Sequence, residues 1–218
     1  MGELLATNIT VLSVVHGDYF ERFATAFFES LESAQCENAI LVSDKAVPVP
    51  SFVNLIVKNF AGTYDFCNTA NEALDSEWGL HMGFDDLLLP NALEPIESDA
   101  DVYGWPHRME GISTGLSTYS GGYEQMVSLH YNPMEGGFAY RKSLLQEIPF
   151  RDVTLFDWSH FCELSHFGKT VEFSGTPRTV WIRRPDSLSL NNVHETHQEV
   201  YRFQEKLKAG LIEKGKPE

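Results

Sequence analysis

The sequence predicts an α/β protein whose core is one open, mostly parallel sheet flanked by helices. In residues 8–84, short β-branched or apolar runs alternate with segments of helical periodicity. The links between these segments are short, and strands and helices that alternate in this way form parallel sheets. Acidic residues follow the predicted strands, as at Asp18, Asp44 and Asp85. Because ligands bind beyond the carboxyl ends of the strands in such sheets, we expect these acids to converge on one rim.

The first half of the chain alternates strands and helices. Residues 8–15 are β-branched and end at His16-Gly17-Asp18, which predicts a buried strand. The following segment is a predicted helix, because its phenylalanines recur every three or four residues. In all, the patterns predict strands at 8–15, 38–44, 52–59 and 77–84, and helices at 19–34, 67–76 and 87–96, the last with a proline in its first turn.

The second half is less regular. Residues 106–125 are rich in Gly, Ser and Tyr and are too long for a simple turn, so we expect a substrate-facing loop or a lid. Around it, the patterns predict strands at 99–105, 126–132, 170–175 and 179–184, a turn into a strand and helix over 135–148, a helix at 155–168 and a polar amphipathic helix from Asn191 onward.

The composition narrows the class of partner. The chain has 31 acidic and 16 basic residues, which gives a formal net charge of −15. Nucleic acid is excluded as a main partner, because neutralising its phosphates takes clustered Lys and Arg. An acidic protein that binds a smaller phosphate ligand is expected to borrow a cation for it.

The cysteines and the apolar runs bear on the compartment. Cys36, Cys67 and Cys162 are odd in number and widely spaced, which favours a reducing environment over a disulfide framework. No run approaches the ~20 apolar residues that cross a bilayer. The first fifteen residues lack the basic start of a signal peptide. We therefore expect a cytoplasmic protein without a transmembrane segment.

Asp85 and Asp86 are adjacent carboxylates at the end of a predicted buried strand. One interpretation is structural, since Asp is a favoured N-cap residue for the segment that follows. The other is a site for Mg²⁺ or Mn²⁺ that also holds substrate phosphates, because hard cations prefer oxygen ligands. Capping explains only one of the two acids, and both interpretations stay open on spacing alone.

The segment SEWGLHMGFDDLLLPNALE resembles the stretch that carries the DXD motif of family 2 glycosyltransferases. Other motifs of that family follow in the same order between roughly residues 8 and 197. They are similar to VLSVVHGDYF, AILVSDK, CNTANEAL, LFDWSHFCEL and VWIRRPDSLSLNNVH in this chain. The resemblance implies a single domain with the GT-A fold over residues 1–190, comprising a nucleotide-binding half of about 1–98 and an acceptor-side half of about 99–190, and a helical tail over 191–218.

The resemblance also implies an activity and its residues. It implies inverting transfer of a sugar from a nucleotide-sugar donor, UDP-linked, to a hydroxyl of a glycan or protein, with Mn²⁺ or Mg²⁺ as cofactor. Asp157 matches the catalytic base. Nucleotide contacts are implied at Gly17, Tyr19, Asp44, Asn68 and Asp85, and metal ligands at Asp85, Asp86 and His194.

Several of these residues also have a structural interpretation. Asp157 taken alone fits a helix N-cap. His194 and His197 fit two exposed side chains on one helix face, and either or neither of them binds the metal. Glu135, Gly136 and Gly137 mark close backbone approach to the donor sugar or a tight turn. Trp158, which follows the catalytic Asp, stacks on a sugar ring or fills the core.

The chain departs from the family pattern at four positions, which keeps two other functions in view. Gly83, Lys45, Cys67 and Phe156 replace residues that the family uses. These losses motivate a degenerate protein that binds a nucleotide sugar without turnover, whereas the presence of Asp85 and Asp157 favours the enzyme. A nucleotidyltransferase ranks lower, because the link after the first strand lacks the Gly-rich, basic loop that cradles a triphosphate.

Overall fold

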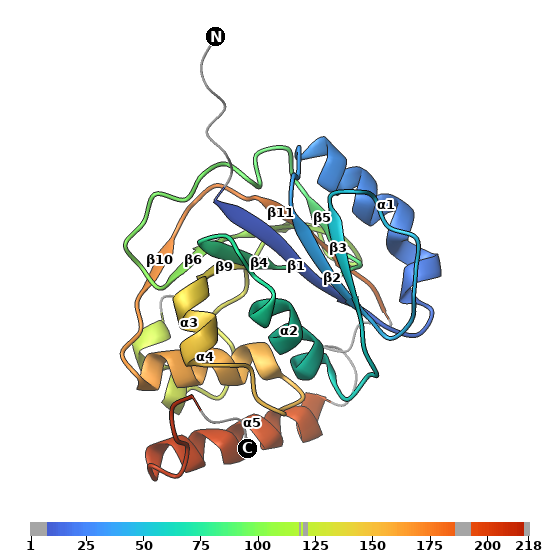
Figure 1. The fold of residues 1–218 in the computed structure, drawn as a ribbon. Helices are drawn as coiled ribbons and strands as arrows, with labels where there is room; N and C mark the ends of the chain where they lie inside the picture. Colours follow the sequence, from blue (N-terminus) through green and yellow to red (C-terminus); the bar gives the residue numbers. More distant parts are fainter. Residues whose placement is uncertain (1–7, 118, 120–121, 186–192, 216–218) are drawn as a thin grey trace.

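The computed structural model describes residues 8–117, 119, 122–185 and 193–215, and its centre is a seven-stranded sheet. β9 is antiparallel to its neighbours β4 and β6, and the other pairings are parallel, which confirms the predicted mostly parallel α/β sheet (Figure 1). In spatial order the strands are β10 (Val171–Phe173), β6 (Val102–Trp105), β9 (Gly137–Arg141), β4 (Trp78–His81), β1 (Ile9–Val15), β2 (Ala39–Ser43) and β3 (Val53–Val57).

Helices cover both faces of this sheet. α1 (Tyr19–Ser33) lies on one face, while α2 (Thr63–Glu72), α3 (Lys142–Glu147) and α4 (Phe156–His166) lie on the other (Figure 1). The alternation of side chains along β1 builds both cores, because Val11 faces the α1 side and Leu12 faces the α2 side. Both residues are fully buried.

A second, smaller sheet lies next to the first. Its strands are, in order, β5 (Leu87–Leu88), β11 (Thr179–Arg183), β7 (His107–Gly111) and β8 (Gly115–Leu116). β11 runs parallel to β7 and antiparallel to β5, and β7 and β8 form a hairpin. The predicted loop over 106–125 therefore contains two strands.

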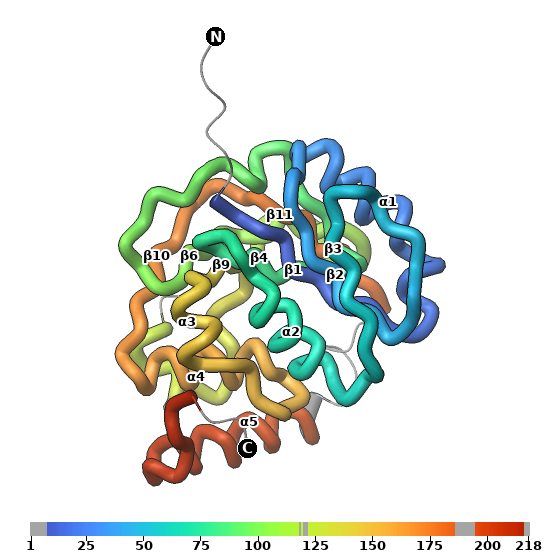
Figure 2. The backbone as a smooth tube through the Cα atoms, in the orientation of Figure 1, coloured from blue at the N-terminus to red at the C-terminus, as the bar shows by residue number. Residues whose placement is uncertain are grey.

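The last helix belongs to the same packed body. α5 (Val193–Lys208) runs along the outside of α4 (Figure 2). It buries Val200, Phe203 and Leu207 in the core on the α2 side of the sheet. Within the described part of the chain, no helix combines the length and apolar character needed to span a membrane.

Two predicted elements are wrong, and in both cases tertiary contacts decide the conformation. The helix predicted over 87–96 is the short strand β5 followed by turns, because Leu87 and Leu88 pair with Val180 and Thr179. The strand predicted over 126–132 is absent: its first three residues end the 3₁₀ helix η1 (Tyr123–Ser128), and 129–132 are irregular. Gln204 of α5 donates hydrogen bonds to two carbonyls of this region, those of Met126 at 3.1 Å and Leu129 at 2.8 Å.

We predict that Gln204→Ala destabilises the fold by about 2 kcal/mol, because it leaves two carbonyls of the η1 region without their buried donor. Gln204 is only 2% exposed. Urea unfolding measures the loss, and Gln198→Ala, at an exposed position of the same helix, is the matched control. Equal stability of the two variants would contradict this role for Gln204.

Candidate active site at the carboxyl ends of the strands

Two adjoining cavities of about 530 and 370 Å³ form one cleft in the molecule. The smaller cavity contains residues from the ends of β1 and β4, including Val14 and Gly83. The larger one lies between β11 and the first turns of α4 and α5. Both are lined by Asp86, His107, Met134, Gly136, Leu155 and Asp157. The cleft therefore brings together Asp86, which follows β4, and the predicted catalytic base Asp157.

Asp86 faces this cleft. Its carboxylate accepts a hydrogen bond from the backbone N–H of Ile182, at 3.0 Å, and it lines both cavities. Burial raises the pKa of Asp86 to about 7, against the opposing effect of the Ile182 hydrogen bond. A carboxyl group with so little compensation for its charge is a favourable position for an additional cation.

Asp85 lies beside Asp86 but has a different partner. It forms an ion pair with Arg184, and both side chains are largely buried. The Arg184 guanidinium also lies 4.5 Å from the ring centroid of Phe23 in α1. Asp85 is not among the residues that line the two cavities. The two acids thus have different surroundings: Asp86 faces the cleft, whereas Asp85 binds Arg184 next to the end of β11.

Because Gly83 has no side chain, a small space remains beside it that both carboxylates face. A Cβ added there would lie 2.8 Å from Oδ1 of Asp85 and 2.8 Å from Oδ2 of Asp86. Both acids therefore present an oxygen to the same small region, which fits two ligands of a hard cation. The side chain of His194, the third predicted ligand, lies outside the described residues. Among the side chains that the structure describes, no group of three or more His, Cys, Asp or Glu residues is arranged to hold a metal ion.

Asp157 occupies the first turn of α4, where backbone N–H groups and the helix dipole favour a negative charge. Its side chain is exposed to the cleft, although the neighbouring protein groups partly desolvate its carboxylate. This desolvation raises the pKa of Asp157, while the backbone N–H groups of Trp158 and of Asp157 itself oppose the shift. An acid placed in this way is suited to take a proton from a ligand in the cleft.

Three of the predicted nucleotide contacts lie at the ends of β1 and β2. The N–H of Gly17, whose φ is +63°, donates a hydrogen bond to Asp44 Oδ2 at 3.1 Å. Tyr19 begins α1, and its ring centroid is 6.0 Å from that of His16. Asp44 Oδ1 is buried without a hydrogen-bond partner within the described residues. The strand ends thus bring these residues together, although none of the three lines the two cavities.

Asn68 has a structural contact instead of a place in the cleft. Its amide donates to the carbonyl of Phe150 at 2.8 Å and accepts from the N–H of Phe150 at 2.9 Å. It lines neither cavity. The structure therefore shows Asn68 joining α2 to the segment that precedes α4.

The Glu135-Gly136-Gly137 segment forms part of the cleft wall, and its glycines are required by packing. A Cβ at Gly136 would lie 2.4 Å from the carbonyl oxygen of Trp105. At Gly137 it would lie 2.3 Å from the indole nitrogen of the same Trp105. Glu135 is exposed and lines the larger cavity.

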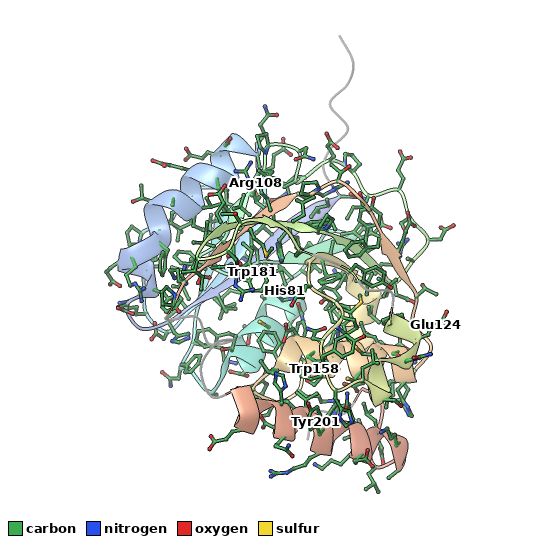
Figure 3. The ribbon with its side chains drawn as sticks, turned by 180° about the vertical axis from the view of Figure 1, so that it is seen from behind. His81, Arg108, Glu124, Trp158, Trp181 and Tyr201 are labelled. Carbon is green, nitrogen blue, oxygen red and sulfur yellow. The ribbon has the colours of Figure 1, made fainter. Side chains whose placement is uncertain are left out.

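Trp158 is only 2% exposed and packs edge-on against His197 and Tyr201 of α5. Figure 3 shows Trp158 and Tyr201 on the helical side of the molecule, and Trp181 nearer the sheets. Trp158 thus belongs to the core, with one edge at the larger cavity. His197 also lines that cavity.

Sequence reasoning missed the β11 residues in the larger cavity, Trp181 and Arg183. The Arg183 guanidinium lies 4.2 Å from the Trp181 ring centroid. Alternation along a strand was the available signal, because it places Thr179, Trp181 and Arg183 on the same face. His107 falls within the loop predicted over 106–125. In the structure it begins β7, and burial lowers its pKa to about 4.

We predict that Asp86→Asn stabilises the protein more at pH 8 than at pH 5. The folded-state pKa of Asp86 is raised above the unfolded value, so its contribution to stability is lost as the pH rises from about 4 to about 7. The amide cannot ionise and escapes this loss. Urea unfolding at both pH values tests the claim, with exposed Glu32→Gln as the control. The same gain at both pH values would contradict the burial of the Asp86 charge.

Comparisons with known proteins agree with this architecture. No protein-family model matches the sequence, and a search of curated proteins finds no significant match. The structure is similar to S. aureus TarS 1–349 in complex with UDP-GlcNAc, with a TM-score of 0.64 and 13% identity over 93% of this chain and 70% of that one. It is also similar to the mannosyltransferase PcManGT from Pyrobaculum calidifontis in complex with GDP-Man and Mn²⁺. That TM-score is 0.62, and the identity is 12% over 96% of this chain and 66% of that one. This chain spans 42% of the longer TarS chain. The chain thus has the GT-A fold of these glycosyltransferase structures.

Proposed function

We propose that this protein is an inverting glycosyltransferase of the family 2 type. In this proposal it moves a sugar from a nucleotide-sugar donor, UDP-linked, to a hydroxyl group of a glycan or protein. One observation carries the proposal: in a GT-A fold, Asp86 and Asp157 line the same cleft beyond the ends of β1 and β4. Structures of TarS with UDP-GlcNAc and with UDP support a nucleotide-sugar donor.

The nucleotide is assigned to the ends of β1 and β2. There the unpartnered Asp44 Oδ1 would accept a hydrogen bond from a base N–H, which removes the cost of a buried orphan oxygen. Gly17 and Tyr19 lie beside it, and the stacked rings of His16 and Phe60, 4.3 Å apart, extend this surface. Asn68 supports the neighbouring segment through Phe150.

A divalent cation, Mn²⁺ or Mg²⁺, is assigned to Asp86 and Asp85, with His194 as the further ligand. The shared space beside Gly83 supports the two carboxylates. When bound, the cation supplies positive charge to the diphosphate as it leaves. The mannosyltransferase solved with Mn²⁺ is consistent with such a cofactor. Arg184 contributes positive charge at the same place through Asp85.

Asp157 is the general base of the proposed reaction. It takes the proton of the acceptor hydroxyl as that oxygen bonds to the anomeric carbon of the donor sugar. The bond between that carbon and the diphosphate oxygen breaks on the opposite face, and the nucleoside diphosphate leaves with its electron pair. A single displacement of this kind inverts the anomeric centre. The raised pKa of Asp157 brings its basicity closer to neutral pH.

A binding protein without turnover is the second candidate, and the Asp85–Arg184 ion pair is the observation that favours it. Arg184 already compensates the charge of one acid that the enzyme would use for its cofactor. Such a protein would bind the donor through the same strand ends. It would release no nucleoside diphosphate with any acceptor.

We predict that Asp157→Asn keeps donor affinity but lowers transfer by roughly 10²- to 10⁴-fold, the usual contribution of a general base. Release of nucleoside diphosphate from a panel of nucleotide sugars, with Mn²⁺ present, measures the effect. Asp152→Asn is the control, because it removes an exposed carboxylate just before α4.

Three outcomes separate the alternatives. Equal turnover in Asp157→Asn and the wild-type protein would remove Asp157 from the mechanism. Donor binding without release by the wild-type protein would favour the binding protein. Release of pyrophosphate from a nucleoside triphosphate and a sugar phosphate would favour a nucleotidyltransferase.

A further inference from the structure

The larger cavity has a lining that differs from that of a phosphate site. Its aromatic members include Trp181 and Tyr131, and Tyr131 is 53% exposed. Hydrogen-bonding side chains surround them, among them Asn132 and Glu135. Cavities of this size commonly hold a small ligand by apolar contact and a few directed polar groups.

Trp181 is the accessible indole of this protein. The chain has four tryptophans. Trp78 and Trp105 are fully buried and Trp158 is 2% exposed, whereas Trp181 is half-buried and lines the cavity. An indole at the edge of a polar cavity offers a flat apolar surface to a ligand.

The neighbours of Trp181 fix its position. Arg183 lies 4.2 Å from the ring centroid. The His107 ring centroid is 5.6 Å away, and His107 Nδ1 is 2.7 Å from the hydroxyl of Thr179. A surface that is already ordered loses little conformational entropy when a ligand binds.

The charges of the cavity select against anionic ligands. Asp86, Glu135 and Asp157 line it, and Arg183 is the cationic Lys or Arg side chain among its described lining residues. Carboxylates accept hydrogen bonds from hydroxyl groups but repel phosphate and uronate groups. An apolar platform beside several acceptors is therefore suited to an uncharged molecule with many hydroxyls.

We propose that this cavity binds an uncharged saccharide as the acceptor, with the indole of Trp181 as the platform beneath one sugar ring. This inference rests on the proposed function, because Asp157 lines the same cavity and is the base that would receive the acceptor proton. The carboxylate of Glu135, which lines this cavity, accepts hydrogen bonds from the sugar hydroxyls. Acceptors that carry phosphate or uronate groups are excluded by the acidic lining.

Tryptophan emission tests the proposal, because Trp181 and one edge of Trp158 are the indoles that line this cavity. The protein, saturated with UDP and Mn²⁺, is titrated with maltose, cellobiose, lactose and N,N′-diacetylchitobiose. Glucuronic acid, glycerol phosphate and a Ser/Thr-containing hexapeptide are the competing classes. We expect at least one neutral disaccharide to shift the emission in a saturable way, and no response from the anionic probes.

Two variants assign that signal to Trp181. Trp181→Ala is expected to weaken binding of the responding disaccharide by about tenfold, and Trp181→Phe to recover part of the loss, because a smaller ring keeps some of the stacking. Calorimetry measures these affinities without relying on the indole. Affinity for UDP, measured by thermal shift, is expected to be the same in all three proteins.

The outcomes are distinguishable. Saturable binding of glycerol phosphate, of glucuronic acid or of the peptide in place of the neutral disaccharides would overturn the proposal. So would the absence of any disaccharide response, or unchanged disaccharide affinity in Trp181→Ala. Failure of the wild-type protein to bind any nucleotide or nucleotide sugar would instead count against the proposed function.

Discussion

The contact between the end of β4 and strand β11 is the constraint on which the site depends. Asp86 accepts the N–H of Ile182, Asp85 pairs with Arg184, and β5 continues the connection by pairing with β11. These contacts attach the small sheet to the large one. Arg184, directly after β11, lies against Phe23 of α1, whereas Trp181 within β11 lines the cleft. The two sheets thus create a cleft that Asp86 lines, while Asp85 beside it pairs with Arg184.

The charge of the protein explains why this contact matters. With a net charge of −15, each buried carboxylate needs compensation. Several cations are committed to structural partners: Arg141 to Glu77, Arg151 to Glu163 and Lys169 to Glu147. The described lining of the cleft keeps three carboxylates and one arginine. A diphosphate that enters it needs additional positive charge, which is the physical reason for assigning a divalent cation there.

The sequence predicted the parts of the fold that depend on local periodicity. The apolar run of β1, the phenylalanine face of α1 and the position of Asp157 in the first turn of a helix all follow from spacing. Convergence at the strand ends was also predictable, because parallel strands end at one edge, and the Gly17–Asp44 hydrogen bond shows it.

Contacts between distant segments were beyond such reasoning. Leu87-Leu88 is a strand because β11 lies beside it, 91 and more residues later in the chain. Met126 lies in a 3₁₀ helix, and its carbonyl accepts a hydrogen bond from the side chain of Gln204. The different partners of Asp85 and Asp86 depend on Arg184, and the position of Trp181 depends on the pairing of β11 with β7 and on the ring of His107. No local pattern contains these partners.

Calorimetric titration of the wild-type protein and of Asp86→Asn with UDP, in Mn²⁺ and then in EDTA, tests the central claim most directly. The account predicts that the wild-type protein binds UDP at least tenfold more tightly in Mn²⁺ than in EDTA, and that Asp86→Asn loses most of this difference. Tight binding of UDP that is the same in Mn²⁺ and in EDTA would show that this cleft does not recruit a cation for its diphosphate. Absence of UDP binding under both conditions would contradict the nucleotide site itself.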